Sequence, residues 1–194
     1  MAEVKVLIKG YAKELKAGWR ASSTSTLIKS NGKNIIFDPG CNRKMLMDSL
    51  SKEGLKPKDI NFIVLSHGHL DHSLLTGAFE NAKVISFESL LYDNDLMLEF
   101  KEDVLGKDIR IIKTPGHAAE HLSLLVKTDK GNYCISGDVF WWTDDEKQIP
   151  DIHKEDSSHP SELNMNELEN SRRKLLELSD FIIPGHGEMF KVKK

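Results

Sequence analysis

The sequence predicts a layered α/β sandwich, in which β-sheets are flanked by helices. Three observations predict this class. Short apolar runs separated by turn residues fill the first half of the chain. Two further apolar runs flank a turn near residue 130, and an amphipathic stretch precedes a last short apolar run. A chain of 194 residues with 39% hydrophobic residues can build one ordinary core, so we expect a single domain over residues 1–194.

The first half is expected to be mainly strands. Apolar alternation over residues 4–8 predicts a first strand, and residues 27–29 and 34–37 flank an Asn-Gly pair that is typical of a hairpin turn. Residues 44–52 have the apolar spacing of a helix. Residues 61–65 form a short apolar run between polar residues, which indicates a buried strand.

The second half is expected to add more strands and one long helix. Residues 163–178 have an amphipathic helical pattern, and Pro184-Gly185 is expected to end the last strand. The predicted strands are residues 84–87, 108–113, 121–128, 132–136 and 181–183.

Composition excludes several classes of protein. With 27 Lys+Arg against 30 Asp+Glu, the net charge of −3 gives no general attraction to nucleic acid, so RNA binding would need a local basic patch or bound metal ions. Cys41 and Cys134 are too few for a disulfide framework, which favours a reducing compartment. Charged residues interrupt the N-terminal apolar stretch and no run is long enough to span a membrane, so we expect a cytoplasmic protein.

Histidine and aspartate recur directly after predicted strand ends, where loops at one edge of a sheet can bring them together. Imidazole and carboxylate ligands suit zinc, manganese or iron. Seven such residues are too many for one tetrahedral ion and about right for two ions sharing a carboxylate and a hydroxide. The candidate ligands are His67, His69, Asp71, His72, His117, Asp138 and His186.

A single histidine is more often a surface or core residue than a ligand. Four candidate ligands within residues 67–72 argue against that interpretation here. His153 and His159 lie in a polar, acidic stretch between Pro150 and Pro160, where a solvated loop is the better interpretation.

The ordered motifs resemble those of the metallo-β-lactamase superfamily, over nearly the whole chain. They are H-x-H-x-D-H at residues 67–72, Thr114-Pro115-Gly116-His117, Gly137-Asp138 and Pro184-Gly185-His186-Gly187. The resemblance implies a four-layer αββα sandwich. It also implies two Zn²⁺ per chain, with Mn²⁺ or Fe²⁺ as alternatives. The implied ligand sets are His67, His69 and His117 for one ion and Asp71, His72 and His186 for the other, with Asp138 bridging.

The resemblance also implies roles around the metals. Asp38 would support the ligand loop without touching metal. Two ions would lower the pKa of a bridging water, and Asp71 could orient the resulting hydroxide. His121 could stabilise an oxyanion or protonate a leaving group, although packing within a strand explains it equally well. The bridging Asp138 departs from true metallo-β-lactamases, so antibiotic hydrolysis is not expected.

The substrate stays open at this stage. The motifs are similar to those of a compact subgroup, the metallo-β-lactamase domain-containing protein 1 group, linked to RNA cleavage, so a phosphodiester is the leading expectation. A thioester or ester hydrolase similar to glyoxalase II is an alternative, although its helical C-terminal domain is not expected here. A persulfide dioxygenase with one iron on His67, His117 and Asp138 is another. A non-catalytic RNA- or partner-binding domain would be expected to lose ligands, and this chain keeps all seven.

Other features are interpreted by position alone. Phe140-Trp141-Trp142 either lines the substrate cleft or packs in the core. Arg172-Arg173-Lys174 is expected on a solvated helix face. Residues 11–25 could be a mobile loop over the site, with Trp19 as its contact residue. The substrate, RNA or a small molecule, and the subunit number are undecided, with a homodimer kept as an option.

Overall fold

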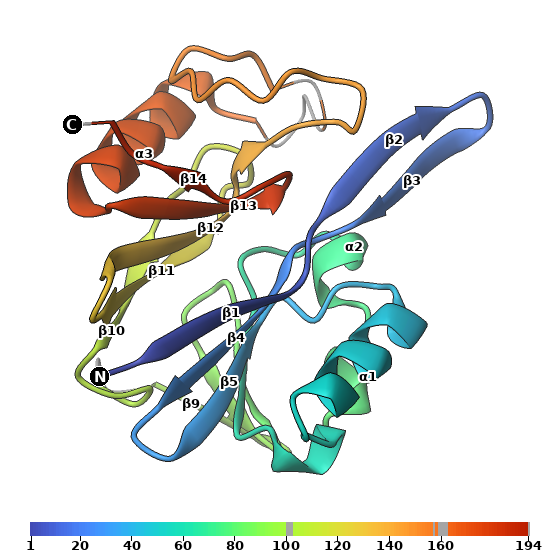
Figure 1. Cartoon of the computed structure of the whole chain (residues 1–194), viewed down its shortest axis with the longest axis vertical. Helices are drawn as coiled ribbons and strands as arrows, with labels where there is room; N and C mark the ends of the chain where they lie inside the picture. Colours follow the sequence, from blue (N-terminus) through green and yellow to red (C-terminus); the bar gives the residue numbers. More distant parts are fainter. Residues whose placement is uncertain (100–102, 157, 159–162, 194) are drawn as a thin grey trace.

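The computed structural model describes residues 1–99, 103–156, 158 and 163–193. Two β-sheets pack face to face, with helices on their outer sides (Figure 1). The first sheet contains, in spatial order, β1 (Glu3–Ile8), β4 (Ser25–Ser30), β5 (Lys33–Phe37), β6 (Phe62–Val64), β7 (Lys83–Ile85), β8 (Leu91–Asp93) and β9 (Leu96–Leu98). The second contains β10 (Ile109–Lys113), β11 (Leu122–Thr128), β12 (Gly131–Trp141), β13 (Phe181–His186) and β14 (Phe190–Lys191).

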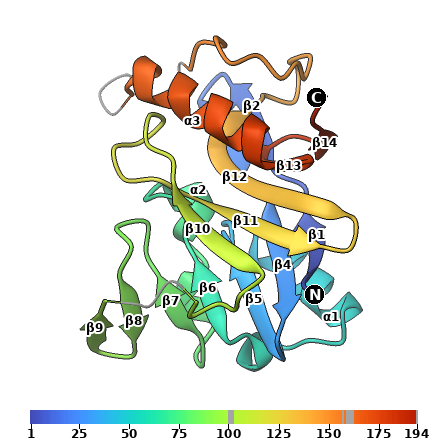
Figure 2. The same cartoon turned by 90° about the vertical axis from the view of Figure 1, so that its left-hand side faces the viewer.

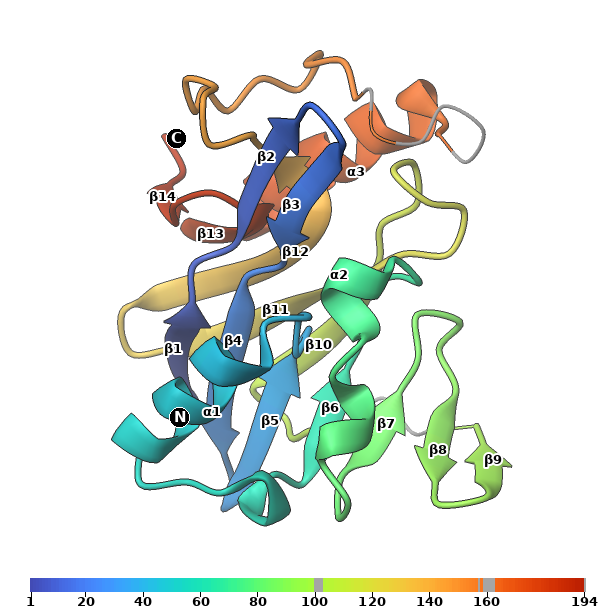
Figure 3. The same ribbon diagram turned by 90° about the vertical axis from the view of Figure 1, so that its right-hand side faces the viewer.

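The helices and one hairpin complete the structure. Helix α1 (Arg43–Lys52) lies outside the first sheet, and α3 (Met165–Leu178) lies along the outer side of the second (Figures 1 and 2). The short helix α2 (Leu70–Ser73) lies near the end of β6, beneath the hairpin of β2 (Tyr11–Leu15) and β3 (Gly18–Ser22) in Figure 3. In the described part of the chain, no helix is both long and apolar enough to cross a membrane.

Alternating side chains of single strands build the layers. Ile35 of β5 belongs to the apolar cluster that joins the two sheets, whereas its neighbour Ile36 packs in a second cluster with Leu46 of α1. In β13, Ile183 joins the inter-sheet cluster and Ile182 belongs to a third cluster with residues of α3. Three clusters separate four layers, so the expected αββα sandwich is confirmed.

The Asn-Gly hairpin is also confirmed. Asn31 and Gly32 connect β4 to β5, with φ angles of 50° and 73°. Two successive residues with positive φ are characteristic of the type I′ turn, whose twist matches that of the strands it connects.

Two strands of the second sheet run further than expected. Strand β12 continues to Trp141, so Asp138 lies within the strand and does not follow it. Strand β13 continues through Pro184 and Gly185 to His186, so the expected strand break is wrong. Proline has no backbone N–H to donate to a neighbouring strand. It is tolerated here because β14 pairs only with Phe181 and Ile182, so no strand lies beside Pro184 on the β14 side of β13.

Residues 11–25 contain a regular hairpin, and the expectation of a loop there is wrong. In the β2–β3 ladder, Ala12 lies opposite Ala21 and Glu14 lies opposite Trp19. Strands β5 and β6 run parallel, as do β12 and β13. Their carboxyl ends lie near this hairpin and α2, where the predicted ligands follow (Figure 3).

Candidate metal centre

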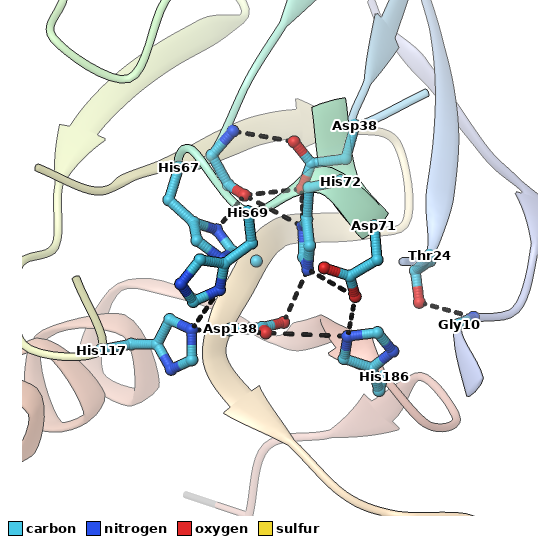
Figure 4. Close-up of polar contacts among 12 residues, drawn as sticks. Gly10, Thr24, Asp38, His67, His69, Asp71, His72, His117, Asp138 and His186 are labelled. Atoms are coloured by element: carbon cyan, nitrogen blue, oxygen red, sulfur yellow. Dashed lines mark hydrogen bonds and ion pairs between the residues drawn. The ribbon is translucent and has the colours of Figure 1, made fainter. Parts of the chain in front are cut away.

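Three imidazole nitrogens converge beside the carboxyl end of β6. The Nε2 atom of His67 lies 2.8 Å from Nδ1 of His69, which lies 3.3 Å from Nε2 of His117 (Figure 4). His67 and His69 are in the turn between β6 and α2, and His117 follows β10. Ligands at 2.0–2.1 Å from a tetrahedral ion stand about 3.3 Å apart, so this spacing fits one metal ion.

A second group lies next to the first. Oδ2 of Asp71 is 3.3 Å from Nε2 of His186 and 3.8 Å from Nε2 of His72. Helix α2 supplies Asp71 and His72, and the end of β13 supplies His186. The ligand atoms of these three residues lie within 4.8 Å of one another, so they too could hold a metal ion.

Asp138 lies between the two groups (Figure 4). Its Oδ1 is 3.3 Å from Nε2 of His72, and its Oδ2 is 3.5 Å from Nε2 of His117 and 3.6 Å from Nε2 of His186. Glycines allow this approach: a Cβ atom on Gly185 would overlap Oδ1 of Asp138, and Gly137 has a φ of +52°. The structure therefore brings all seven predicted ligand residues together.

The chemistry of the group fits a metal. Oδ1 of Asp138 and Nε2 of His72 are buried and lie 3.3 Å apart, but neither makes a hydrogen bond of good geometry in the described structure. Such atoms cost free energy unless a ligand satisfies them. Two carboxylates and five imidazoles offer the donor set that zinc and iron accept.

Asp38 supports the second group from behind. Its Oδ1 accepts from the Ser66 backbone N–H at 2.8 Å, and its Oδ2 lies 2.7 Å from Oγ of Ser66 and 2.8 Å from Nδ1 of His72. Asp38 is buried and has a φ of 50°, a conformation that is unfavourable for most residues. It stands where the resemblance placed it, behind a ligand and away from the metal positions.

Sequence reasoning missed Asp156, which supports the first group. Its Oδ2 lies 2.7 Å from Nδ1 of His117, and its side chain is fully buried. Burial alone would raise the pKa of Asp156, but the hydrogen bond and charge of His117, together with the hydrogen bonds from Ser158, outweigh burial and lower the pKa to about 2. His153, from the same stretch, is exposed as expected and pairs with Glu169, whereas His159 lies outside the described residues.

The electrostatics of the centre follow from buried charge. Burial would raise the pKa of Asp138, but the nearby His72 and His186 lower it well below its usual range. Burial would lower the pKa of His72, yet Asp138 and Asp38 raise it well above its usual value. In the metal-free protein both ring nitrogens of His72 are therefore protonated. A metal ion that binds at Nε2 must displace the proton there.

Comparisons with known proteins identify the family. The family model described as the metallo-beta-lactamase superfamily matches residues 18–86. Metallo-beta-lactamase domain-containing protein 1 of Xenopus laevis is 30% identical over 98% of this chain and 82% of its own length. The chain belongs to the metallo-β-lactamase superfamily.

Two further comparisons give one relative and one similar fold. A protein of Methanocaldococcus jannaschii, named as a probable metallo-hydrolase, is 32% identical over 77% of this chain and 68% of its own length. The solved structure of a provisionally assigned metallo-beta-lactamase from Thermotoga maritima has a TM-score of 0.72 at 23% identity, covering 98% of this chain and 99% of that one. Together with the His/Asp cluster, membership makes this chain a metal-dependent hydrolase with a metal cofactor.

The superfamily site opens into a pocket of about 460 Å³. Its described lining residues are Ala12, Trp19, Ala21, His69, Asp71, His117, Asp138, Trp141, Ser158 and His186. Trp19, on the hairpin, lies where the contact residue was expected. Of the aromatic run, only Trp141 lines the pocket, because Phe140 and Trp142 are buried in the apolar cluster beneath α3.

The structure also bears on His121 and Arg172. His121 is buried behind His67, with ring centres 5.1 Å apart, and does not line the pocket. Its Nδ1 lies 2.9 Å from Oγ1 of Thr114, so its position supports the packing role and not a part in proton transfer to substrate. Arg172 is buried, so the solvated helix face is wrong for it, although Arg173 and Lys174 are exposed.

Proposed function

We propose that this superfamily member is a dinuclear hydrolase that cleaves small ester or thioester bonds. The observation that carries the proposal is the pair of adjacent ligand groups that share Asp138 beneath one pocket. Zinc is the proposed metal, with manganese or iron as alternatives. The proposed ligands are His67, His69 and His117 for one ion and Asp71, His72 and His186 for the other, with Asp138 between them.

Two divalent ions held by these residues would lower the pKa of a water molecule, so that hydroxide would be available near neutral pH. Asp71 is partly exposed, while one of its oxygens faces His186. A carboxylate in this position can accept a hydrogen bond from the nucleophile and direct it toward the pocket. Asp71 is therefore proposed to act both as a ligand and as the orienting group.

The lining of the pocket supports a small, uncharged substrate. None of the described lining residues is Lys or Arg, and three side chains of the hairpin, Ala12, Ala21 and Trp19, form an apolar wall. Lys13 and Arg20 face each other in the ladder between the Ala12–Ala21 pair and the pair that contains Trp19. Because side chains alternate along a strand, both basic residues lie on the other face of the hairpin. Apolar walls with a few polar groups are typical of small-molecule sites.

The phosphodiester alternative rests on the resemblance to the compact RNA-linked subgroup. Two ions could by themselves attract one phosphate. A longer RNA would need basic side chains along its path, and the pocket offers none among its described residues. Small esters are therefore the better supported class.

The test is a substrate panel run on the zinc-loaded protein. It contains S-lactoylglutathione, a homoserine lactone, bis-p-nitrophenyl phosphate and single-stranded RNA. We expect turnover of a carbonyl substrate, and we expect Asp71→Asn and His69→Ala each to lower kcat/KM at least 100-fold. Asp48→Asn, an exposed carboxylate on α1, is the matched control and should keep full activity.

Three results would count against the proposal. Cleavage of RNA alone would support the phosphodiester alternative. Normal turnover by Asp71→Asn would show that the active site is assigned wrongly. If the protein holds one ferrous ion per chain and consumes oxygen when given a persulfide, it is a dioxygenase and the hydrolase proposal is wrong.

A further inference from the structure

A buried carboxylate stands behind one imidazole of each ligand group. Asp38 supports His72 in the second group, and Asp156 supports His117 in the first. Asp38 follows β5 in the sheet framework, whereas Asp156 lies in the segment that connects β12 to α3. Nothing in the proposed chemistry explains why a carboxylate of that segment is buried against the metal centre.

Both oxygens of Asp156 are engaged. Oδ2 lies 2.7 Å from Nδ1 of His117, and Oδ1 accepts from the backbone N–H of Ser158 at 3.1 Å and from its hydroxyl at 2.6 Å. Oδ1 already accepts two hydrogen bonds and Oδ2 lies within hydrogen-bond distance of Nδ1, so this geometry favours the His117 tautomer with its hydrogen on Nδ1. This leaves the lone pair of Nε2 directed toward Nδ1 of His69, at 3.3 Å.

Arg172 of α3 holds the segment that carries Asp156. Its Nη1 donates to the carbonyl oxygens of Ile152 at 3.0 Å and Lys154 at 2.6 Å, and its Nε donates to that of Val139 in β12 at 3.0 Å. The guanidinium group is buried, and all of these acceptors are main-chain atoms. The backbone two residues before Asp156 is therefore fixed to both α3 and β12.

We propose that Asp156 is a positioning residue for the metal centre, which holds the His117 ring in the orientation and tautomer that a metal ion requires. Arg172 keeps the Asp156 segment in place. The inference rests on the proposed function only in assigning an ion to His67, His69 and His117. It concerns metal binding and requires no particular substrate.

Zinc affinity tests the proposal directly. Competition with a chromophoric chelator would be measured for the wild type, Asp156→Ala, Asp156→Asn and Asp151→Ala. We expect Asp156→Ala to weaken one of the two zinc sites 10- to 100-fold, the usual effect of removing a carboxylate behind a ligand histidine. Asp156→Asn should lose less, because its amide oxygen can still accept from Nδ1. Asp151→Ala, an exposed carboxylate in the same segment, should bind like the wild type.

A second readout separates positioning from general stability. Long-range ¹H–¹⁵N NMR spectra of the zinc-loaded wild type should show the His117 hydrogen on Nδ1, at low field, and Asp156→Ala should lose that low-field signal while the remaining spectrum persists. Unchanged zinc affinity of both sites in Asp156→Ala would overturn the inference, as would a wild-type His117 with hydrogen on Nε2. If the wild type binds zinc but hydrolyses no substrate, the proposed function fails while this inference stands.

Discussion

At the scale of single residues, buried carboxylates determine the state of the imidazoles beside them. Asp138 faces three histidines, whereas Asp38 and Asp156 each contact one from behind. A buried carboxylate without such partners would take up a proton near neutral pH. Because Asp138 and Asp156 are paired in this way, their pKa values are lowered on folding, and the protein gains stability that depends on pH.

Asp156 gives a measurable pH dependence. Folding lowers its pKa from 3.8 to about 2, so its stabilising contribution is complete above pH 3.8 and is lost as the pH falls toward 2. A shift of this size corresponds to about 2 kcal/mol. In urea unfolding of the metal-free proteins, the advantage of the wild type over Asp156→Asn should therefore shrink by about this amount between pH 5 and pH 2. An advantage that stays constant over this range would contradict the assigned pairing.

The clustering of the candidate ligands could be predicted because the spacing at residues 67–72 is informative by itself. Residues 67–72 place four candidate ligands in one short stretch, which few other functions require. Asp156 could not be predicted, because it is one of several acidic residues between Pro150 and Pro160 and nothing local distinguishes it. His121 could not be assigned from the sequence either, since its position near the Thr-Pro-Gly-His motif allowed chemistry or packing, and only the structure places its side chain behind His67.

At the scale of elements, Arg172 connects helix α3 to the metal centre. Replacing it with methionine removes a buried cation and leaves three main-chain carbonyls without their donor. We expect Arg172→Met to lower the free energy of unfolding by about 3 kcal/mol or more, as measured by urea denaturation.

Arg173 offers the matched control on the next position of the helix. It is exposed and pairs with Glu169, one turn away at 3.8 Å. Such surface pairs contribute little, so Arg173→Met should change the free energy of unfolding by about 0.5 kcal/mol or less. Equal losses in the two variants would show that the buried hydrogen bonds of Arg172 are not the cause.

The predicted elements succeeded where one face of a strand or helix is buried. Residues 44–52 and 163–178 show helical spacing because their apolar sides pack on the sheets, as in α1 and α3. The β2–β3 hairpin was missed because it stands apart from both sheets, so its residues lack the apolar alternation of a half-buried strand. The extension of β13 was missed because a proline can lie within a strand only where no neighbouring strand needs its N–H, and the sequence does not show which strands lie beside Pro184.

At the scale of the whole molecule, the fold determines where the chemistry takes place. Ligands that are distant in the sequence meet because β5 with β6, and β12 with β13, run parallel and end beside α2 and the hairpin. The apolar pattern predicted a layered α/β sandwich, and the four-layer order was implied by the resemblance that the ordered motifs carry. The pocket could not, because its wall depends on how the β2–β3 hairpin lies over the metal centre.

The most direct test of the account is the number of metal ions per chain. The protein would be stripped with a chelator, titrated with zinc and measured by inductively coupled plasma mass spectrometry, together with a His186→Ala variant. The two adjacent groups predict two zinc ions per wild-type chain, with hydrolysis restored only as the second ion binds, and one tightly bound ion in His186→Ala. Full activity with a single ion in the wild type, and no change in His186→Ala, would contradict the dinuclear centre.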